Sequence, residues 1–536
     1  MPDPRPIVRR SLPGLVVLLA LAACPGSNAG VGASCGGNDD CSGMLQCLNS
    51  RCVPRCTRAP DCGDGYACDG DGLCQLATGV SGEHCKSEVD CASGLSCQID
   101  GATDDNHVLL ASCTDEHVTR AAGAACDADA DCRNGTCALG HCVDLCRDTR
   151  DCGEANTCMK IPHVAIDRAV FYGCLPTQGV VTWSIPVLSP SAQVALPIPS
   201  AARSAELIMS IDGVNQKVGA ASIQAPLPDA TRLYSPPCTP GVGGCQLADA
   251  LDRFYKNPIR HQPQPVESVL AFPSGSSPAL ELGTYRVQVS SFRSDGATGS
   301  AIPRVTAVVH LDTADPTTER TLDLHFFFLD LSAHPCQALT DNATLDAAAA
   351  AAAPYFKGTF LSVLRTVFFR ANIGIGTTTF EDISRRPELD TLDTLDHNDL
   401  GALLSLGTYA GGINVFFVRA LSPAGLQAYA PNPGPAGVGG TKRSGIVIGL
   451  DTLCYRDWTA MARLTAHELA RYMGLYHNVE RETPAHPDWR DLINDGTTGA
   501  TNLMYFSELA GSAQLPSGTD LTPGQADILR RSAVLR

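Results

Sequence analysis

Between residues 176 and 320, short apolar runs alternate with turns rich in proline and glycine. The runs cover residues 180–187, 206–211, 285–292 and 305–311. Runs of this length, rich in β-branched residues and bounded by turn residues, are typical of antiparallel strands. We therefore predict an all-β sandwich, an accessory domain, over residues 176–320.

The pattern changes near residue 321, where strand and helix periods are mixed. A dense apolar run over residues 321–331 predicts a buried strand, and residues 412–418 and 444–450 predict two more. The Pro/Gly-rich residues 431–440 predict a loop between the last two strands.

Two helices are predicted in the same segment by their apolar spacing and their first residues. Phe356 and Phe360 begin a series at helical spacing, so we expect a helix that starts near Pro354. The seven alanines before it are compatible with a low-complexity linker. Thr522 and Pro523 have the residue types that cap and begin a helix.

The N-terminus has the pattern of an export signal. Three arginines precede an apolar run over residues 15–23, which is too short to span a bilayer. The run ends in Leu-Ala-Ala-Cys24, which resembles the lipobox of bacterial lipoproteins. The resemblance implies a signal peptide over residues 1–23 and a lipidated Cys24, followed by a tether to residue 34. An ordinary signal peptide, with Cys24 in a disulfide, is the alternative.

Two further features favour the lipid anchor and its location. Without Cys24 the chain has 24 cysteines, an even number that suits complete pairing. Residue 25 is proline, whereas aspartate there commonly retains lipoproteins of this kind in the inner membrane. We therefore expect the outer membrane or the cell surface, with the lipid on Cys24 as the contact with the membrane.

Composition limits the class of partner. The chain has 536 residues, of which 44% are hydrophobic and 18% charged, which indicates a multidomain globular protein. The formal net charge is −17. Because nucleic acids and anionic membrane surfaces bind basic patches, this charge argues against both as partners.

The cysteines indicate an oxidising compartment and a repeat. Of 25 cysteines, 21 precede residue 175, and residues 35–175 hold five successive groups of four with recurring Asp-Cys dipeptides. Units this small replace a core with disulfides, whose connectivity the sequence does not reveal. Zinc modules use C-x₂-C pairs, and the sequence has none. The aspartates at 127, 129 and 131 resemble a calcium loop, but the glycine and glutamate that complete such a loop are missing.

Four cysteines lie beyond the repeats. Cys238 and Cys245 flank a glycine-rich turn, so we expect them to pair with each other. Cys336 and Cys454 are left over, and we expect a second disulfide between them.

One stretch near the C-terminus carries candidate chemistry. It contains His467-Glu468, Gly474 and His477, and Met504 follows in Asn-Leu-Met-Tyr. The spacing resembles the metzincin zinc-peptidase motif H-E-x-x-H-x-x-G-x-x-H with its Met-turn, and is most similar to the pappalysin branch. The resemblance covers about 200 residues and implies an α+β or α/β zincin domain over residues 321–536. It also implies an antiparallel strand at the edge of the cleft, for which residues 444–450 are the candidate.

The family's roles are assigned here by resemblance. His467 and His477 match zinc ligands, and Glu468 matches the general base that takes a proton from the metal-bound water. Gly474 matches the turn that ends the helix, and Met504 matches the floor beneath the metal.

Arg471 departs from the motif, because it stands where the second zinc histidine belongs. A guanidinium has no lone pair to offer a metal and carries its own positive charge. Zinc sites of this type need three imidazoles, so zinc binding is doubtful. We expect Arg471 to fill the metal position and to pair with Glu468, three residues earlier.

Three interpretations of the motif are open. The first, which we favour, is an inactive homologue of a zinc metalloendopeptidase that binds extracellular protein or peptide. The second is an active peptidase in which His486 or Asp488 replaces the lost ligand, and the third is an accidental motif. From a different class, the chain is a non-enzymatic adhesion lipoprotein, or one whose repeats inhibit proteases.

Overall fold

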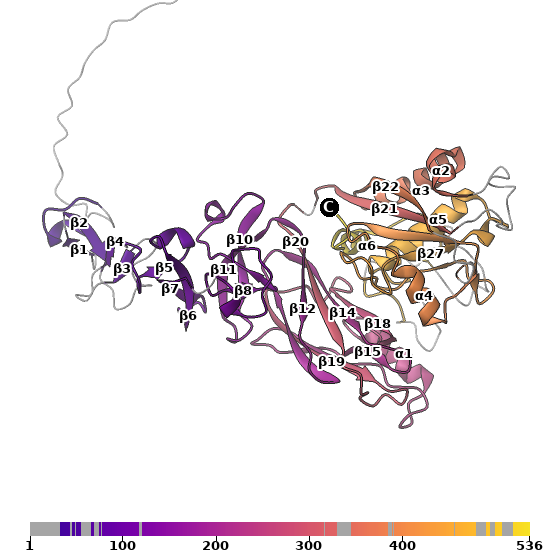
Figure 1. Cartoon of the computed structure of the whole chain (residues 1–536), viewed down its shortest axis with the longest axis horizontal. Helices are drawn as coiled ribbons and strands as arrows, with labels where there is room; N and C mark the ends of the chain where they lie inside the picture. The colour runs from indigo at the N-terminus through magenta and orange to yellow at the C-terminus, as the bar shows by residue number, and fades with distance from the viewer. Residues whose placement is uncertain are drawn as a thin grey trace, which may run out of the picture. The chain divides into compact units, whose positions relative to one another are not determined.

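The structure is a computed structural model of the chain. It describes residues 33–42, 45–48, 50–54, 66–68, 74–76, 78–116, 120–315, 317–329, 345–383, 389, 391–454, 456–478, 489–493, 499–505 and 518–536. The chain divides into two compact units, residues 1–78 and 79–536, and most of the ordered structure is β-sheet (Figure 1). Within the described ranges, no helix combines the length and the apolar character needed to cross a membrane.

The first unit contains small hairpins, and two disulfides cross-link the first of its repeats. A turn of 3₁₀ helix precedes the hairpin in the first repeat, and a second hairpin follows. The elements are η1 (Asn38–Asp40), β1 (Leu45–Leu48), β2 (Arg51–Pro54), β3 (Tyr66–Cys68) and β4 (Cys74–Leu76).

The second unit begins with three more repeats of the same plan, each with a 3₁₀ turn and a hairpin. The third repeat has β5 (His84–Cys85), η3 (Glu88–Asp90), β6 (Leu95–Thr103) and β7 (Leu109–Asp115). The fourth has η4 (Asp129–Asp131), β8 (Cys137–Ala138) and β9 (His141–Cys142), and the fifth has η5 (Thr149–Asp151), β10 (Asn156–Pro162) and β11 (Val170–Pro176).

The disulfides in these repeats follow one rule. In each repeat whose bonds are described, the first cysteine pairs with the third and the second with the fourth. The pairs are Cys35–Cys47, Cys41–Cys52, Cys85–Cys97, Cys91–Cys113, Cys126–Cys137, Cys132–Cys142, Cys146–Cys158 and Cys152–Cys174. The predicted disulfide-rich repeats are therefore confirmed, and the structure supplies the connectivity.

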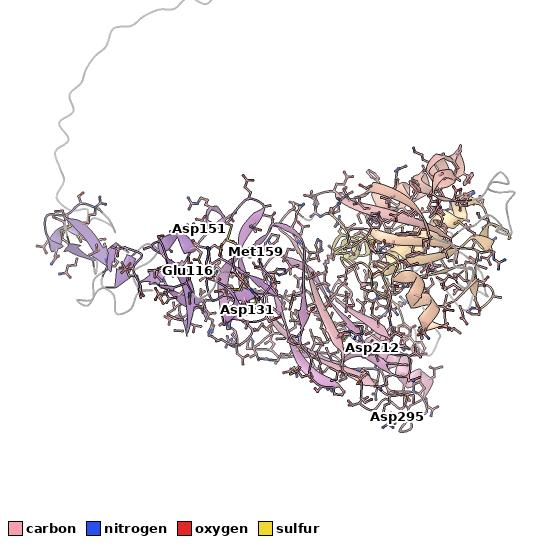
Figure 2. All side chains as sticks on the ribbon, viewed as in Figure 1. Glu116, Asp131, Asp151, Met159, Asp212 and Asp295 are labelled. Carbon is pink, nitrogen blue, oxygen red and sulfur yellow. A yellow bond between two sulfur atoms is a disulfide. The ribbon has the colours of Figure 1, made fainter. Side chains whose placement is uncertain are left out.

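The Asp-Cys dipeptide has a structural explanation. Asp131, which is labelled in Figure 2, accepts hydrogen bonds from the backbone N–H groups of Asp127, at 2.8 Å, and Ala128, at 3.1 Å. Asp40, Asp90 and Asp151 accept the equivalent bond four residues back in their own repeats. The carboxylate thus caps the start of each 3₁₀ turn, where backbone N–H groups have no partner within the turn.

Two antiparallel sheets follow and share one buried core. The first has the order β12 (Gln178–Ile185), β20 (Arg304–Asp312), β14 (Ala202–Ser210), β18 (Glu267–Phe272). The second has the order β13 (Ser191–Ile198), β19 (Gly283–Phe292), β15 (Lys217–Gln224), β16 (Arg232–Tyr234), and β17 (Gln264–Pro265) also pairs with β15. The four apolar runs from which strands were predicted lie mostly within β12, β14, β19 and β20.

One helix, α1 (Leu247–Lys256), interrupts the second sheet. Just before it, Cys238 and Cys245 form a disulfide across the glycine-rich turn. The isolated histidines of this region have structural contacts. His261 accepts the Ala220 N–H at Nε2, 3.0 Å away, and His310 Nδ1 lies 2.9 Å from the Arg531 carbonyl oxygen.

The last segment is built on a five-stranded sheet. Its order is β22 (Ile373–Ile383), β21 (Arg320–Leu329), β24 (Ile413–Val418), β27 (Ile446–Gly449), β26 (Ala428–Tyr429). The first four strands are parallel, and β26 is antiparallel to β27. The three predicted strands correspond to β21, β24 and β27.

The prediction of residues 444–450 as the antiparallel edge strand is wrong. β27 lies inside the sheet, parallel to β24, and the antiparallel edge strand is the two-residue β26. The chain leaves the sheet after β24, runs back through β26, and returns through the Pro/Gly-rich loop in the direction of β24. A strand of two residues leaves no periodic pattern in the sequence.

The helices of this segment are α2 (Ala347–Ala352), α3 (Leu361–Phe369), α4 (His397–Leu404), α5 (Trp458–Tyr472) and α6 (Pro523–Arg530). The alanine run forms α2, capped by the Asp346 side chain, so the linker interpretation is wrong. A π-helical turn, η7 (Pro354–Phe360), joins it to α3, and η9 (Leu450–Cys454) precedes α5. β23 (Thr391–Asp393) and β25 (Ala420–Ser422) form a short parallel pair outside the main sheet.

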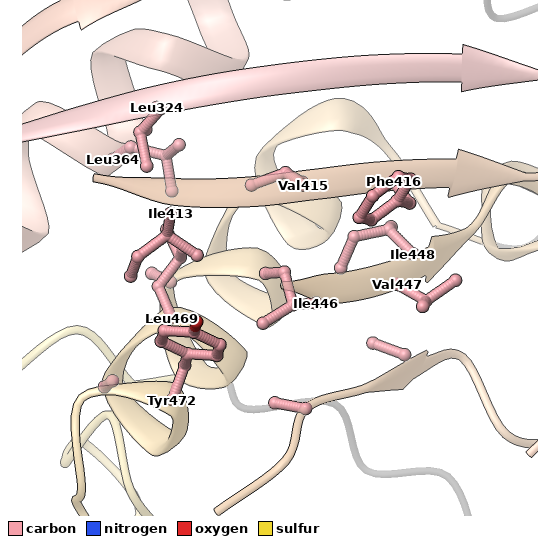
Figure 3. Close-up of a cluster of buried hydrophobic side chains, with 14 of the residues drawn as sticks. Leu324, Leu364, Ile413, Val415, Phe416, Ile446, Val447, Ile448, Leu469 and Tyr472 are labelled. Carbon is pink, nitrogen blue, oxygen red and sulfur yellow. The ribbon is translucent and has the colours of Figure 1, made fainter. Parts of the chain in front are cut away.

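The sheet and α5 share a buried hydrophobic core. Leu469 and Tyr472 of α5 lie beside Ile446 of β27, and Phe416 of β24 lies in the same cluster (Figure 3). Leu469 is fully buried and Tyr472 is 2% exposed. Because one face of α5 is held in this core, the position of its C-terminal end is fixed relative to the sheet.

Candidate functional site

The candidate site lies at the end of α5. Asp457 caps the helix by accepting the Ala460 N–H at 2.8 Å, and the helix ends at Tyr472. Gly474 follows with φ of +99°, in the left-handed region that a glycine adopts without a Cβ clash. The Leu475 N–H then bonds back to the Ala470 carbonyl oxygen at 3.0 Å. This turn reverses the chain and brings the following residues beside the helix.

The reversal places His477 against His467. Their Nε2 atoms lie 3.1 Å apart, and both rings are buried, with 3% and 6% exposure for His467 and His477. The His467 Nδ1 atom lies 2.8 Å from the Leu503 carbonyl oxygen. A carbonyl oxygen only accepts, so His467 carries its proton on Nδ1 and presents the lone pair of Nε2 to the site.

The segment that contains Leu503 is a tight turn. Tyr505 N–H bonds to the Asn502 carbonyl oxygen at 3.1 Å, and the fully buried Met504 donates its N–H to the Asn502 side chain at 2.8 Å. The Asn478 N–H bonds to the Met504 carbonyl oxygen at 3.1 Å. The residue after His477 is therefore tied directly to this turn.

Gln525 was missed by the sequence reasoning and supports the same turn. Its side-chain amide exchanges two hydrogen bonds with that of Asn502, at 2.8 and 3.2 Å. It also takes part in the cap of α6, since the Gln525 N–H bonds to Thr522 Oγ1 at 3.1 Å. The S/T-x-x-E/Q cap signature at residues 522–525 was visible in the sequence, but its second partner, Asn502, was not.

Arg471 contacts one of the two histidines. Its Nη1 lies 2.8 Å from Nε2 of His477, and its side chain is partly exposed. The guanidinium can only donate, so His477 Nε2 accepts this bond with its lone pair. That lone pair is the one through which His477 would hold a metal.

The predicted pairing of Arg471 with Glu468 is absent. Within the described part of the chain, neither a hydrogen bond nor an ion pair reaches the Glu468 carboxyl group. Burial raises the pKa of Glu468, and the positive charge of Arg471 partly offsets that rise. The reason for the difference is the turn at Gly474, which presents His477 to the guanidinium at hydrogen-bond distance.

Another missed residue, Arg260, holds the far side of the His477 loop. Arg260 is 1% exposed, and its guanidinium carbon lies 5.0 Å from the ring centres of both Tyr255 and Tyr476. The Tyr476 hydroxyl donates to the Arg260 carbonyl oxygen at 3.1 Å. This residue of the β-rich region thus fixes the neighbour of His477 through cation–π contacts.

The loop before β27 connects the β-rich region to α5. The Ala436 N–H donates to the Glu206 carboxyl group at 3.0 Å, and the Gly434 N–H donates to the Tyr472 carbonyl oxygen at 3.0 Å. A Cβ on Gly434 would lie 2.1 Å from the Tyr472 ring, so the backbone passes directly against that side chain. The helix that carries His467 is therefore packed between the sheet and this loop.

These residues do not fit the zinc site of the motif. Two imidazole Nε2 atoms converge, but the third position holds a permanent cation whose N–H already bonds to one of the two lone pairs. Zinc held by two histidines next to a guanidinium lacks a ligand and meets electrostatic repulsion. We derive no chemistry through a metal at this site.

Other predicted site residues lie outside the described residues. These are Cys24, Cys336, His486 and Asp488. Cys454 is disulfide-bonded, and the identity of its partner stays a prediction. Elsewhere, four groups of cysteine sulfurs lie close together, but each sulfur in them belongs to a disulfide and offers no thiolate to a metal.

Comparison of the sequence with protein-family models and with curated proteins gives no match in either case. The resemblance to the metzincin motif therefore depends only on the sequence of residues 467–477 and of the turn around Met504.

Proposed function

We propose that residues 321–536 form a metzincin-like domain that binds an extracellular protein or peptide without cleaving it. The observation that carries the proposal is the 2.8 Å contact between Arg471 Nη1 and His477 Nε2. A guanidinium that uses the lone pair of one imidazole cannot coexist with a metal on that lone pair. Without a metal, no activated water is available and Glu468 has no proton to take from it.

The support for the metzincin-like part of the proposal comes from several coordinated features. α5 ends before a left-handed Gly474, the chain reverses, and the Nε2 atoms of His467 and His477 converge above the turn that contains Met504. The Leu503 carbonyl oxygen orients His467, a role that outer-shell acceptors commonly have for metal-binding histidines. An accidental motif gives no reason for the helix end, the chain reversal and the two histidines to occur together. An inactivated peptidase site accounts for all of them, so we favour it.

The test is the zinc content of the full secreted chain with its disulfides intact. The wild type is expected to retain little zinc after dialysis, and Arg471→His is expected to retain about one equivalent, since it restores a third imidazole. The control is the double variant Arg471→His/His477→Ala, which again lacks a ligand. Cleavage of casein is expected only with Arg471→His. One equivalent of zinc in the wild type, lost in His477→Ala, would overturn the proposal and direct attention to His486 and Asp488.

We also propose that the lipid on Cys24 anchors the chain at the outer membrane or the cell surface. The proposal is supported by the sequence pattern around Cys24. Expression of the full precursor with Cys24→Ser is expected to move the protein from the membrane fraction to the soluble extracytoplasmic fraction. Release of the wild type by high salt, without detergent, would contradict lipid anchoring, because an acyl chain is held by the hydrophobic effect.

A further inference from the structure

The arginine that takes the place of a metal ligand leaves a positive charge at the candidate site. Its Nη1 donates to His477, and this is the single hydrogen bond of the guanidinium among the described residues. A guanidinium has five N–H groups, so four have no acceptor among the residues that the structure describes. One of them, on Nε, is buried. A buried donor without an acceptor is unfavourable, which makes the site incomplete as it stands.

The neighbouring imidazoles do not compete for an incoming acceptor. His467 is held by the Leu503 carbonyl oxygen with its lone pair on Nε2, and His477 accepts from Arg471. The Nε2 atom of His477 thus already has contacts within the site, with Arg471 at 2.8 Å and with His467 Nε2 at 3.1 Å. The charge and the spare N–H groups at this point belong to Arg471, and its side chain is partly exposed.

We propose that Arg471 makes the former metal position a binding site for a carboxylate of the bound peptide. This inference rests on the proposed function, because it names the chemistry that the non-cleaving domain recognises. A guanidinium matches a carboxylate through two parallel N–H bonds, whereas a metal site of this family polarises a neutral carbonyl. The ligand is an aspartate or glutamate side chain, or a C-terminal carboxylate.

The first probe is glutarate, and its uncharged analogue glutaramide is the control ligand. Binding to the full chain is measured by isothermal titration and by the shift in melting temperature, at constant ionic strength because exposed charge interactions are screened. Glutarate is expected to bind and glutaramide not to bind. Arg471→Met is expected to weaken glutarate binding roughly tenfold or more. Arg463→Met, on the same helix, is the matched control and is expected to match the wild type.

A second arm separates the two sources of carboxylate. The first two probes are a tripeptide that is blocked at both ends and has a central glutamate, and the same tripeptide with glutamine in its place. The third probe is N-acetyl triglycine, which has a free C-terminal carboxylate. Preference for the first indicates an internal acidic residue, and preference for the last indicates a chain terminus. If Arg471→Met does not fold, Arg471→Lys keeps the charge without the planar fork and is expected to bind more weakly than the wild type.

The outcomes distinguish this inference from the proposed function. The carboxylate site is refuted if the wild type and Arg471→Met bind glutarate with equal affinity, or if the wild type does not bind glutarate. If the wild type is also free of zinc in that case, the proposal of a non-cleaving domain is retained. A zinc-bound wild type with Arg471-dependent glutarate binding refutes the proposed function and retains the carboxylate site.

Discussion

Glu206 allows a quantitative test of how the β-rich region supports α5. Its carboxyl group is buried at 5% residue exposure and accepts the Ala436 N–H at 3.0 Å. Burial raises the pKa of Glu206 well above its usual value, and the hydrogen bond from Ala436 offsets only part of that rise. The folded protein therefore favours the protonated carboxyl group, whereas the unfolded chain ionises it near pH 4.5.

The sign of the pH dependence follows from these two states. Below pH 4.5 both forms are protonated, and Glu206 contributes no pH dependence. Above that pH the unfolded chain releases a proton that the folded chain retains, so the free energy of unfolding falls as pH rises. The slope is about 1.4 kcal/mol per pH unit until the pKa of the folded state is reached.

Glu206→Gln removes this proton while keeping the volume and an acceptor for Ala436. The variant is expected to gain stability relative to the wild type by about 1.4 kcal/mol for each pH unit above about pH 5. Urea unfolding at several pH values, with the disulfides intact, measures the difference. All three tryptophans, Trp183, Trp458 and Trp489, lie in the second unit, so their fluorescence reports its unfolding. The matched control is Glu281→Gln, which changes an exposed carboxyl group.

A pH-independent difference between Glu206→Gln and the wild type would refute this reasoning. It would mean that Glu206 is ionised in the folded protein, with a compensating charge that its contacts do not account for. A slope of the same size in Glu281→Gln would assign the effect to general charge rather than to the buried site.

Two further predictions concern the turns that bring the histidines together. Gly474→Ala is expected to lower the free energy of unfolding by about 1–2 kcal/mol, because alanine is strained at a φ of +99°; an unchanged urea midpoint would show that the turn relaxes freely. Asn502→Ala removes the acceptor of the buried Gln525 Nε2 group and of the Met504 N–H and is expected to cost about 1–3 kcal/mol, with the exposed Asn398→Ala as control. Equal urea midpoints for the two asparagine variants would contradict the supporting role of Asn502.

Strong periodic patterns predicted the elements of the fold well. The apolar run at residues 321–331 became β21, and the helical spacing that begins at Phe356 and Phe360 became η7 and α3, because buried strands and amphipathic helices impose a period on the sequence. β26 has two residues and no detectable period, so its place at the sheet edge was assigned to β27 instead. Disulfide connectivity has no sequence signal at all, since every pairing is compatible with the same spacing.

The contacts of the candidate site were less predictable than its residues. Arg471 lies three residues after Glu468, a spacing that favours pairing on an isolated helix. In the folded chain the reversal after Gly474 supplies His477 as a nearer partner. Arg260 and Gln525 contact the site from distant positions in the chain, and a single sequence contains no record of such contacts.

The order of pairing in the cysteine repeats has a consequence for how the chain acquires its bonds. Each bond joins the first cysteine to the third or the second to the fourth, over 10 to 22 residues. As a chain is synthesised, the first two cysteines of a repeat emerge together, and an oxidant that joins neighbours in order of arrival makes the wrong bond. Thiol–disulfide exchange is the reaction that corrects such a bond. Because each described bond of the repeats stays within its own repeat, an error in one repeat can be corrected without opening the bonds of the next.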